Sequence, residues 1–249
     1  MLPDILAPGS RVLDIGSGPG RHALALAAEG HHVALVDISA ACLDAAQRRF
    51  EEAGLTDRLL MVQRSDASGL NVKAGAYDAV LLFGPLYHLM DDGESRACVD
   101  HAVAALAPGG HLLAIFLTRT SIVRDLIKRG RFDEIHTLLD TGYLDHGRYK
   151  PLTAKSRADY MPPVRTHSLA EAEDLLRKAG LHITTVHALE GAAAWMRPYI
   201  DEVGADDTAF SELSAVVRAT ARLPELIEAG DHFLVSARRP LLPATTPWP

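Results

Sequence analysis

The chain has 249 residues, of which 48% are hydrophobic and 23% charged, and its formal net charge is −7 at pH 7. This composition is typical of a folded globular protein and argues against disorder. The acidic balance disfavours a large nucleic-acid interface, which would need a basic face. No apolar segment approaches the roughly 20 residues needed to cross a bilayer. We therefore expect no nucleic-acid partner, no membrane contact and a cytoplasmic location.

The first predicted element is a short apolar strand over residues 11–15, which ends in a glycine-rich turn. Glycines follow at alternate positions, Gly16, Gly18 and Gly20, and a helix is predicted over 21–29. Because glycine has no Cβ, such a turn can bend sharply and let a ligand approach the backbone. A strand, a glycine turn and a helix N-terminus form the general plan of an adenosine-nucleotide site. The spacing differs from the Gly-x-Gly-x-x-Gly pattern of dinucleotide-binding proteins.

Carboxylates follow the next two predicted strands. The apolar run 33–37 ends in Asp37, about 20 residues after the glycines, where a ribose-binding acid is expected. A carboxylate can accept hydrogen bonds from two hydroxyls, so it suits a cis-diol. The third run, 59–62, precedes Asp66. Taken alone, Asp37 could instead cap the helix predicted over 40–53, and Asp66 could be an acid of a turn.

Two further strands, 79–83 and 112–117, flank a helix predicted over 95–106. The runs are apolar throughout rather than alternating, which is typical of a parallel sheet covered on both faces. Alternating strands and helices predict a doubly wound sheet that binds its ligand at the carboxyl ends of the strands. The candidate residues named above all lie at those ends.

After residue 118 the alternation is interrupted twice. Helical patterns over 121–130 and 132–139 lie in the first interruption. The helix predicted over 168–179 has Ser168 as its N-cap, and Glu171 completes a capping box. We predict a cofactor-binding half over 1–118, an inserted substrate lid over 119–166, the rest of the α/β domain over 167–240 with a helical insertion at 191–229, and an extended tail over 241–249.

Taken in order, these segments resemble the motifs of the class I S-adenosylmethionine-dependent methyltransferases of the bacterial small-molecule type. The resemblance rests on Asp14 before the glycine turn, on Asp37 and Asp66, on the stretch 84–89 after the fourth strand, and on 232–238, which is similar to that family's antiparallel seventh strand. It implies a doubly wound, mostly parallel seven-stranded α/β sheet with helical lid insertions. It also implies S-adenosyl-L-methionine as the cofactor.

The same resemblance implies which residues contact the cofactor. The acid Asp14 would reach the methionine ammonium, although it could also cap the amides of the turn. Asp37 would hold the ribose and Asp66 the adenine. The expected cofactor-binding residues are Asp14, Gly16, Gly18, Gly20, Asp37, Ile38, Asp66, Ala67 and Phe83.

Methyl transfer from a sulfonium requires alignment, exclusion of water and, for some acceptors, removal of a proton. His88, after the fourth strand, is the candidate general base because imidazole titrates near neutral pH. Tyr87, the second candidate at the catalytic position, is expected to be a packing or orienting residue beside the cofactor. Alternatively, His88 packs against the cofactor without moving a proton. Residues of the two insertions are expected to line the substrate pocket, unless they pack the lid onto the sheet: Tyr143, Tyr160, Trp195 and Arg197.

Two departures from related families narrow the acceptor. The stretch 84–87 lacks the acidic or amide residue and the second proline of nucleic-acid amino methyltransferases. The stretch 117–120 lacks the Asp-Asn pair of metal-dependent enzymes, and Asp91 and Asp92 are expected to be unpartnered. The sequence thus predicts metal-independent transfer to oxygen or nitrogen of a small molecule. The alternatives are a methyltransferase of protein or RNA and a non-catalytic cofactor-binding protein, and the acceptor and the oligomeric state are left open.

Two groups of polar residues are expected to be solvated. His31 and His32 lie at the entry to a strand. The basic run formed by Arg124, Lys128, Arg129 and Arg131 is expected to be a solvated helix face, with an anchor for an acidic substrate as the alternative. His22, in the first turn of the first helix, is expected to be a surface or packing residue.

Overall fold

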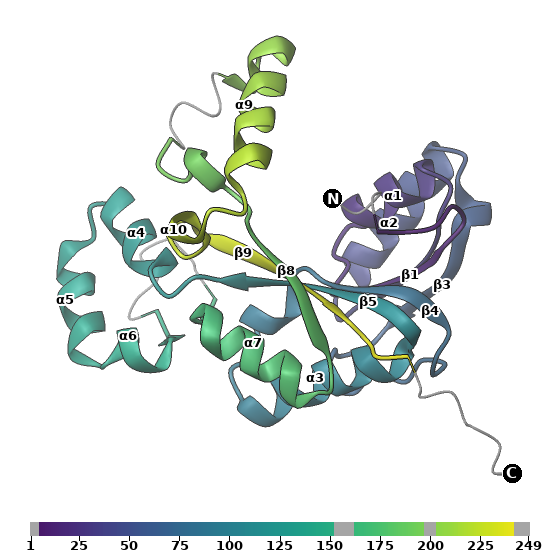
Figure 1. Ribbon diagram of the computed structural model, residues 1–249, viewed down its shortest axis with the longest axis horizontal. Helices are drawn as coiled ribbons and strands as arrows, with labels where there is room; N and C mark the ends of the chain where they lie inside the picture. Colours follow the sequence, from purple (N-terminus) through teal and green to yellow (C-terminus); the bar gives the residue numbers. More distant parts are fainter. Residues whose placement is uncertain (1–4, 152–161, 197–202, 242–249) are drawn as a thin grey trace, which may run out of the picture.

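Seven strands form one sheet at the centre of the computed structural model, which describes residues 5–151, 162–196 and 203–241 (Figure 1). The strands lie in the order β3-β2-β1-β4-β5-β9-β8. Their bounds are β1 Arg11–Ile15, β2 His32–Asp37, β3 Leu59–Arg64, β4 Tyr77–Leu82, β5 Leu106–Leu117, β8 His182–Ala188 and β9 His232–Arg238.

The sheet is parallel except at β9. Strands β1 to β5 pair in parallel, whereas β9 runs antiparallel to both of its neighbours, β5 and β8. The chain moves outward from β1 to β3 and then returns to place β4 on the other side of β1. This reversal opens a crevice at the carboxyl ends of β1 and β4. The predicted α/β fold, with its antiparallel strand at 232–238, is confirmed.

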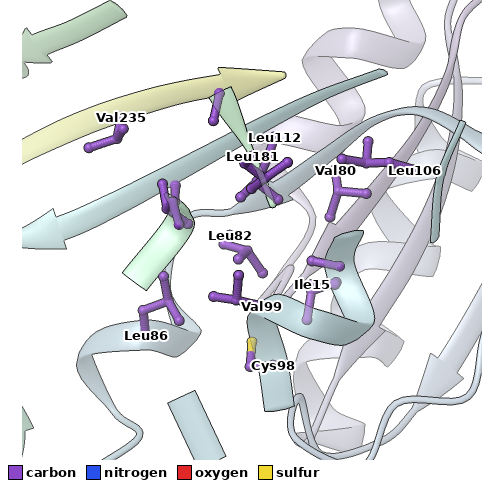
Figure 2. Packing of buried hydrophobic residues seen from close by; sticks show 14 of the residues in the cluster. Ile15, Val80, Leu82, Leu86, Cys98, Val99, Leu106, Leu112, Leu181 and Val235 are labelled. Carbon is purple, nitrogen blue, oxygen red and sulfur yellow. The ribbon is translucent and has the colours of Figure 1, made fainter. Parts of the chain in front are cut away.

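Helices cover both faces of the sheet. Helices α1 (Arg21–Ala28) and α2 (Ala40–Glu52) bury an apolar stripe against one face. Helices α3 (Asp92–Ala105) and α7 (Leu169–Lys178) cover the other. On that second face Leu82, Val99 and Leu181 meet in one buried cluster (Figure 2). Strands buried on both sides explain why their sequences are apolar at successive positions.

The predicted capping box at the start of α7 is present. The Ser168 side chain accepts a hydrogen bond from the backbone N–H of Glu171, and the Glu171 carboxylate accepts one from the backbone N–H of Ser168. Two otherwise unsatisfied donors of the first helical turn are thereby paired. Ser39 caps α2 in a similar way, with its hydroxyl 3.3 Å from the Cys42 nitrogen.

A separate small core holds the segment between β5 and α7. It contains α4 (Ser121–Lys128), α5 (Phe132–Asp140), the short helix α6 (Tyr143–His146) and a two-stranded pair, β6 (Arg148–Tyr149) and β7 (Val164–Arg165). Figure 1 shows α4, α5 and α6 gathered beyond the end of the sheet. Helices were predicted where α4 and α5 lie. The other three elements are too short for a periodic pattern and were not predicted.

The described parts of the segment between β8 and β9 are largely helical. It contains the 3₁₀ turn η4 (Gly191–Ala193), α9 (Asp207–Thr220) and α10 (Pro224–Ile227). No residue of α9 is buried, and the helix projects from the sheet in Figure 1. Within the described residues, no helix is long and apolar enough to span a membrane.

Two expectations of solvation are wrong. His31 is 4% exposed, because its backbone N–H donates to the Leu26 carbonyl and holds the residue against the end of α1. Arg124 is also 4% exposed, because α4 turns it toward the segment before β9. Its guanidinium donates to the carbonyls of Ala229 and Ala194.

Candidate active site

A cavity of about 590 Å³ opens at the carboxyl ends of β1, β2 and β4. It lies at the crevice between β1 and β4, the position at which doubly wound sheets bind their ligands. Most of the residues predicted to bind the cofactor or to act in catalysis line this one cavity: Asp14, Gly16, Asp37, Ile38, Asp66, Ala67, Phe83, Tyr87 and His88.

The glycine turn is shaped by close packing. Gly16 and Gly20 both have φ +72°, a left-handed conformation that favours glycine. A Cβ on Gly16 would lie 2.9 Å from the Pro85 ring, and one on Gly20 would lie 2.9 Å from the Ala46 Cβ. At Gly18, by contrast, a Cβ would meet nothing within 4 Å. Gly16 and Gly20 therefore let the turn approach the β4 end and α2, while Gly18 leaves open space.

Asp37 connects β2 to the glycine turn. One carboxylate oxygen accepts the backbone N–H of Gly18 at 2.7 Å, and the other accepts that of Ser39 at 2.8 Å. The residue that caps α2 is Ser39, so the alternative of Asp37 as the helix cap is not realised. Each carboxylate oxygen keeps further lone-pair capacity toward the cavity. Asp37 can therefore hold the turn and accept hydroxyl hydrogen bonds at once.

Asp14 is a buried carboxyl group without a partner. The residue is 1% exposed, and neither carboxyl oxygen has a hydrogen-bond partner among the described residues. The amides of Gly16 and Ser17 donate instead to the Val36 carbonyl, so Asp14 does not cap the turn. Burial, with the charge of Asp37 nearby, raises the pKa of Asp14 to about 7. A buried carboxylate is costly unless a cation or a donor pairs with it, so this site suits a cationic ligand group.

Asp66 lies at the edge of the cavity, beyond β3. One oxygen accepts hydrogen bonds from the backbone N–H and the hydroxyl of Ser68, at 2.7 and 2.6 Å. These bonds hold the pKa of Asp66 below its usual range. Asp66 is thus an acid of a turn that also lines the cavity, and its second oxygen is available to a ligand.

Tyr87 is the last residue of the 3₁₀ turn η2 (Pro85–Tyr87), which lies between β4 and α3, and His88 follows it. The Tyr87 hydroxyl donates to the Phe83 carbonyl at 3.2 Å. The centres of the Tyr87 and His88 rings are 4.7 Å apart. Burial raises the pKa of Tyr87 and lowers the pKa of His88. The imidazole is therefore neutral at pH 7 and able to accept a proton. No side chain in the described parts of the chain hydrogen-bonds to the His88 ring.

The predicted substrate residues are not brought together. Tyr143 is fully buried in the small core of the first insertion, with its hydroxyl 3.1 Å from the Thr166 hydroxyl. This placement corresponds to the packing alternative, because the ring faces the interior of the lid. Trp195 is 69% exposed, and the Arg124 guanidinium lies 4.2 Å from its ring centre. Tyr160 and Arg197 lie outside the described residues.

Some site residues were not predicted. His22 lines the cavity and meets the Phe83 ring edge-on, with 5.0 Å between ring centres. The available signal was its position in the first turn after the glycines, where side chains border the ligand.

The expectation that Asp91 and Asp92 have no partners is wrong. Asp91 accepts the amides of Gly93 and Glu94 as the N-cap of α3, and Asp92 pairs with Arg148 and Arg165.

Comparison with known proteins places the chain among methyltransferases. Residues 12–110 match the family model described as a methyltransferase domain. A ubiquinone biosynthesis O-methyltransferase of Xylella fastidiosa is 30% identical over 181 residues, which cover 73% of this chain and 64% of that relative. A tRNA 5-carboxymethoxyuridine methyltransferase of Escherichia coli is 28% identical over 125 residues, covering 50% and 47%. Residues 12–110 thus form a methyltransferase domain of the class I S-adenosylmethionine-dependent type, and the chain spans about half to two thirds of the length of these two curated relatives.

The fold of this chain is shared with solved structures. A solved S-adenosylmethionine-dependent methyltransferase from Methanosarcina mazei has a TM-score of 0.65 and 18% identity, and the match covers 97% of each chain. The cofactor of the family is S-adenosylmethionine. The cavity fits it, because the buried unpaired carboxylate of Asp14 suits the ammonium group, and Asp37 can accept bonds from a diol.

Proposed function

We propose that this protein transfers a methyl group from S-adenosylmethionine to an oxygen or nitrogen atom of a small molecule, without a metal. The observation that carries the proposal is the buried, unpartnered Asp14 in the same cavity as Asp37 and Asp66. When bound, the cofactor supplies a methyl group on a sulfonium sulfur, which is already activated for displacement.

In this proposal each acid has a separate task. Asp14 pairs with the ammonium group, whose charge compensates the cost of its burial. Asp37 accepts hydrogen bonds from the ribose hydroxyls while its other contacts hold the glycine turn. Asp66 accepts a hydrogen bond from the adenine amino group. The three acids, at or just after the ends of β1, β2 and β3, would together hold the cofactor.

The proposal of a small-molecule acceptor is supported by the charges around the site. A macromolecular nucleic-acid substrate would require free cations to meet its phosphates. Several arginines of the first insertion are instead paired with acids: Arg119 with Glu171, Arg124 with Asp231, and Arg148 and Arg165 with Asp92. The net charge of −7 points the same way. The named substrates of the relatives include tRNA, so RNA remains the principal alternative.

His88, which the sequence predicts as the proton acceptor, lies on the cavity wall. Its neutral imidazole is in the form that accepts a proton, and Tyr87 stands against it. If His88 is the base, His88→Ala will lose turnover while keeping its affinity for the cofactor. Unchanged turnover would remove that role.

The reaction is tested by incubating the protein with methyl-deuterated S-adenosylmethionine and a metabolite extract, followed by mass spectrometry. A small molecule heavier by one labelled methyl group would support the proposal and identify the acceptor. The matched control is Asp37→Ala, which should bind the cofactor weakly and give little product. Label on RNA or protein alone would favour the macromolecular alternative. Calorimetry that detects no binding of S-adenosylmethionine or its demethylated product would overturn the cofactor assignment.

A further inference from the structure

A histidine–glutamate pair lies at β8 and β9, on the side of the sheet away from β1 to β3. His232 is the first residue of β9 and pairs with Leu117 at the carboxyl end of β5. Glu190 follows β8, and one of its oxygens is 2.7 Å from the His232 Nδ1. Its other oxygen accepts the backbone N–H groups of Asp231 and His232, at 3.1 and 3.0 Å. These three bonds fix the carboxylate against the start of β9.

The chain leaves space for this carboxylate. A Cβ on Gly230 would lie 2.5 Å from a Glu190 oxygen, so a larger residue at 230 would displace it. Burial opposes the ionisation of Glu190, but the hydrogen bonds from the ring and the backbone N–H of His232 hold its pKa below the usual range. Glu190 is therefore an anion at neutral pH and acts as an acceptor toward the ring.

The pair fixes the tautomer of the imidazole. Because the Glu190 carboxylate accepts a hydrogen bond from Nδ1, the neutral ring carries its proton there and has a lone pair at Nε2. Within the described parts of the chain, no group hydrogen-bonds to Nε2. The His232 side chain is 36% exposed, so a ligand can reach that nitrogen. An oriented imidazole with a free lone pair is the arrangement of a general base.

The His232 ring lies near one residue of the cavity wall, Tyr87. The centres of the His232 and Tyr87 rings are 6.4 Å apart, and Tyr87 lines the cavity. The ends of β4, β5 and β9 form the half of the sheet edge that the three cofactor acids leave free. An acceptor placed between this half and the cofactor would meet Tyr87, His88 and His232.

His232 and His88 differ in what orients their rings. The His88 ring has no orienting hydrogen bond from a described residue, and burial lowers its pKa. Once His232 is protonated, the adjacent Glu190 carboxylate stabilises the imidazolium. The difference lies in the carboxylate, which one histidine has and the other lacks.

We propose that His232, oriented by Glu190, is the general base of the methyl transfer, and that the acceptor atom carries a proton at neutral pH, as a phenol or an ammonium group does. This inference rests on the proposed function. The acceptor's O–H or N–H bond breaks and its proton moves to Nε2 of His232. The acceptor's electron pair forms the new bond to the methyl carbon, and the electron pair of the broken C–S bond stays on sulfur. A carboxylate acceptor would need no such base.

Several other titratable or charged groups surround His232, so the kcat–pH profile is compared between variants. Those on the elements packed around it are Tyr87 and His88 of the η2 region, Glu190 after β8, Asp231 before β9, and Arg124 and Lys128 of α4, which pair with Asp231.

The first test needs no acceptor. In ¹⁵N-histidine-labelled protein, NMR at pH 8 should show the neutral His232 ring protonated at Nδ1, with His232→Gln used to assign the signal. In Glu190→Gln, whose amide group can donate to Nδ1, the proton should move to Nε2 or be shared. Protonation at Nε2 in the unaltered protein, or no change in Glu190→Gln, would overturn the proposal.

The second test uses the acceptor identified by the labelling screen. His232→Gln should lower kcat by about 10²- to 10⁴-fold, the usual contribution of a general base, while cofactor affinity and melting temperature stay unchanged. His88→Gln should lower kcat much less. Glu190→Gln should also move the acidic limb of the kcat–pH profile to lower pH, which a purely structural role would not do.

Two outcomes separate this proposal from the one on which it rests. A kcat for His232→Gln within threefold of the unaltered protein, or an unmoved acidic limb in Glu190→Gln, overturns the base role and leaves the methyl transfer intact. Absence of any labelled product from the unaltered protein overturns both, whatever tautomer NMR finds.

Discussion

Asp14 combines a structural cost with a binding function. Its pKa of about 7 in the folded protein compares with 3.8 for an unperturbed aspartate. Between these pH values the folded protein holds a proton that the unfolded chain has lost. The free energy of unfolding of the cofactor-free protein should therefore fall as pH rises from about 4 to about 7 and level off above that. The free-energy cost of burying the ionised Asp14 carboxylate is offset only when a cation binds beside it.

The variant Asp14→Asn should remove this pH dependence. Relative to the unaltered protein, it should gain stability between pH 4 and pH 8, up to about 4 kcal/mol at 1.4 kcal/mol per pKa unit. Urea unfolding at several pH values measures the effect, and the exposed Asp44→Asn is the control that should not change it. The same Asp14→Asn variant should bind S-adenosylmethionine more weakly. Parallel stability curves for Asp14→Asn and the unaltered protein would contradict the burial argument.

A comparison of two glycines tests the packing of the turn. Gly20 and Gly54 have similar φ values, +72° and +67°, but a Cβ would be 2.9 Å from Ala46 only at Gly20. Gly54→Ala should cost about 1–2 kcal/mol of stability, from the left-handed backbone alone. Gly20→Ala should cost clearly more and should also weaken cofactor binding, because the turn must move from α2. Equal losses in denaturant unfolding would show that the turn tolerates the shift.

The sequence predicted the acids of the cofactor site more reliably than the residues of the acceptor site. Asp14 and Asp37 lie at the carboxyl ends of β1 and β2, and Asp66 follows β3. Because the carboxyl ends of parallel strands meet at one edge, strand prediction was enough to bring these acids together. Tyr143 and His232 depend on the tertiary contacts of the insertions. Nothing in the local pattern distinguished a buried lid tyrosine from one that faces a ligand, or indicated that Glu190 would meet His232.

At the scale of elements, Arg124 connects the two insertions. It belongs to α4, donates to the carbonyls of Ala194 beside η4 and Ala229 after α10, and its guanidinium nitrogen is 3.2 Å from an Asp231 oxygen. One buried side chain thus holds together three segments that are distant in sequence. It also holds the residue that precedes His232.

Replacing Arg124 should loosen these segments together. Arg124→Met leaves two carbonyls and Asp231 without their partner and should cost about 3 kcal/mol, as expected for breaking a buried ion pair. Hydrogen exchange should accelerate in residues 191–196 and 224–230 and stay unchanged in β1 and β4. The control Arg129→Met removes a partly exposed pair with Asp125 on the same helix and should cost no more than about 0.5 kcal/mol. Uniform exchange across the sheet in Arg124→Met would contradict a local connection.

Elements with a long apolar run or a cap were predicted from the sequence, whereas very short elements were not. Strands β1, β2 and β9 and helices α1, α2 and α7 were predicted within a few residues, because each has a long apolar run or a cap. β6 and β7 have two residues each and α6 has four. Such segments are defined by their partners rather than by periodicity.

At the scale of the whole molecule, the fold divides the site into two halves. Strands β1 to β3 and their loops carry the cofactor acids, and β4, β5 and β9 carry the aromatic and histidine side chains. The alternation of apolar runs predicted the first half, and the resemblance of 232–238 to the seventh strand of a known family predicted the antiparallel strand. The sequence could not predict which helices of the insertions border the second half, because their contacts are among themselves.

The position of β9 also sets the order in which a growing chain can complete its sheet. Among the described residues, β8 pairs only with β9, and 44 positions separate the end of β8 at Ala188 from the start of β9 at His232. At about 5–20 residues per second, β8 must wait roughly 2 to 9 s on the ribosome for its partner. The five parallel strands can assemble before that. The nascent chain would therefore be able to hold a nucleotide before its acceptor side exists.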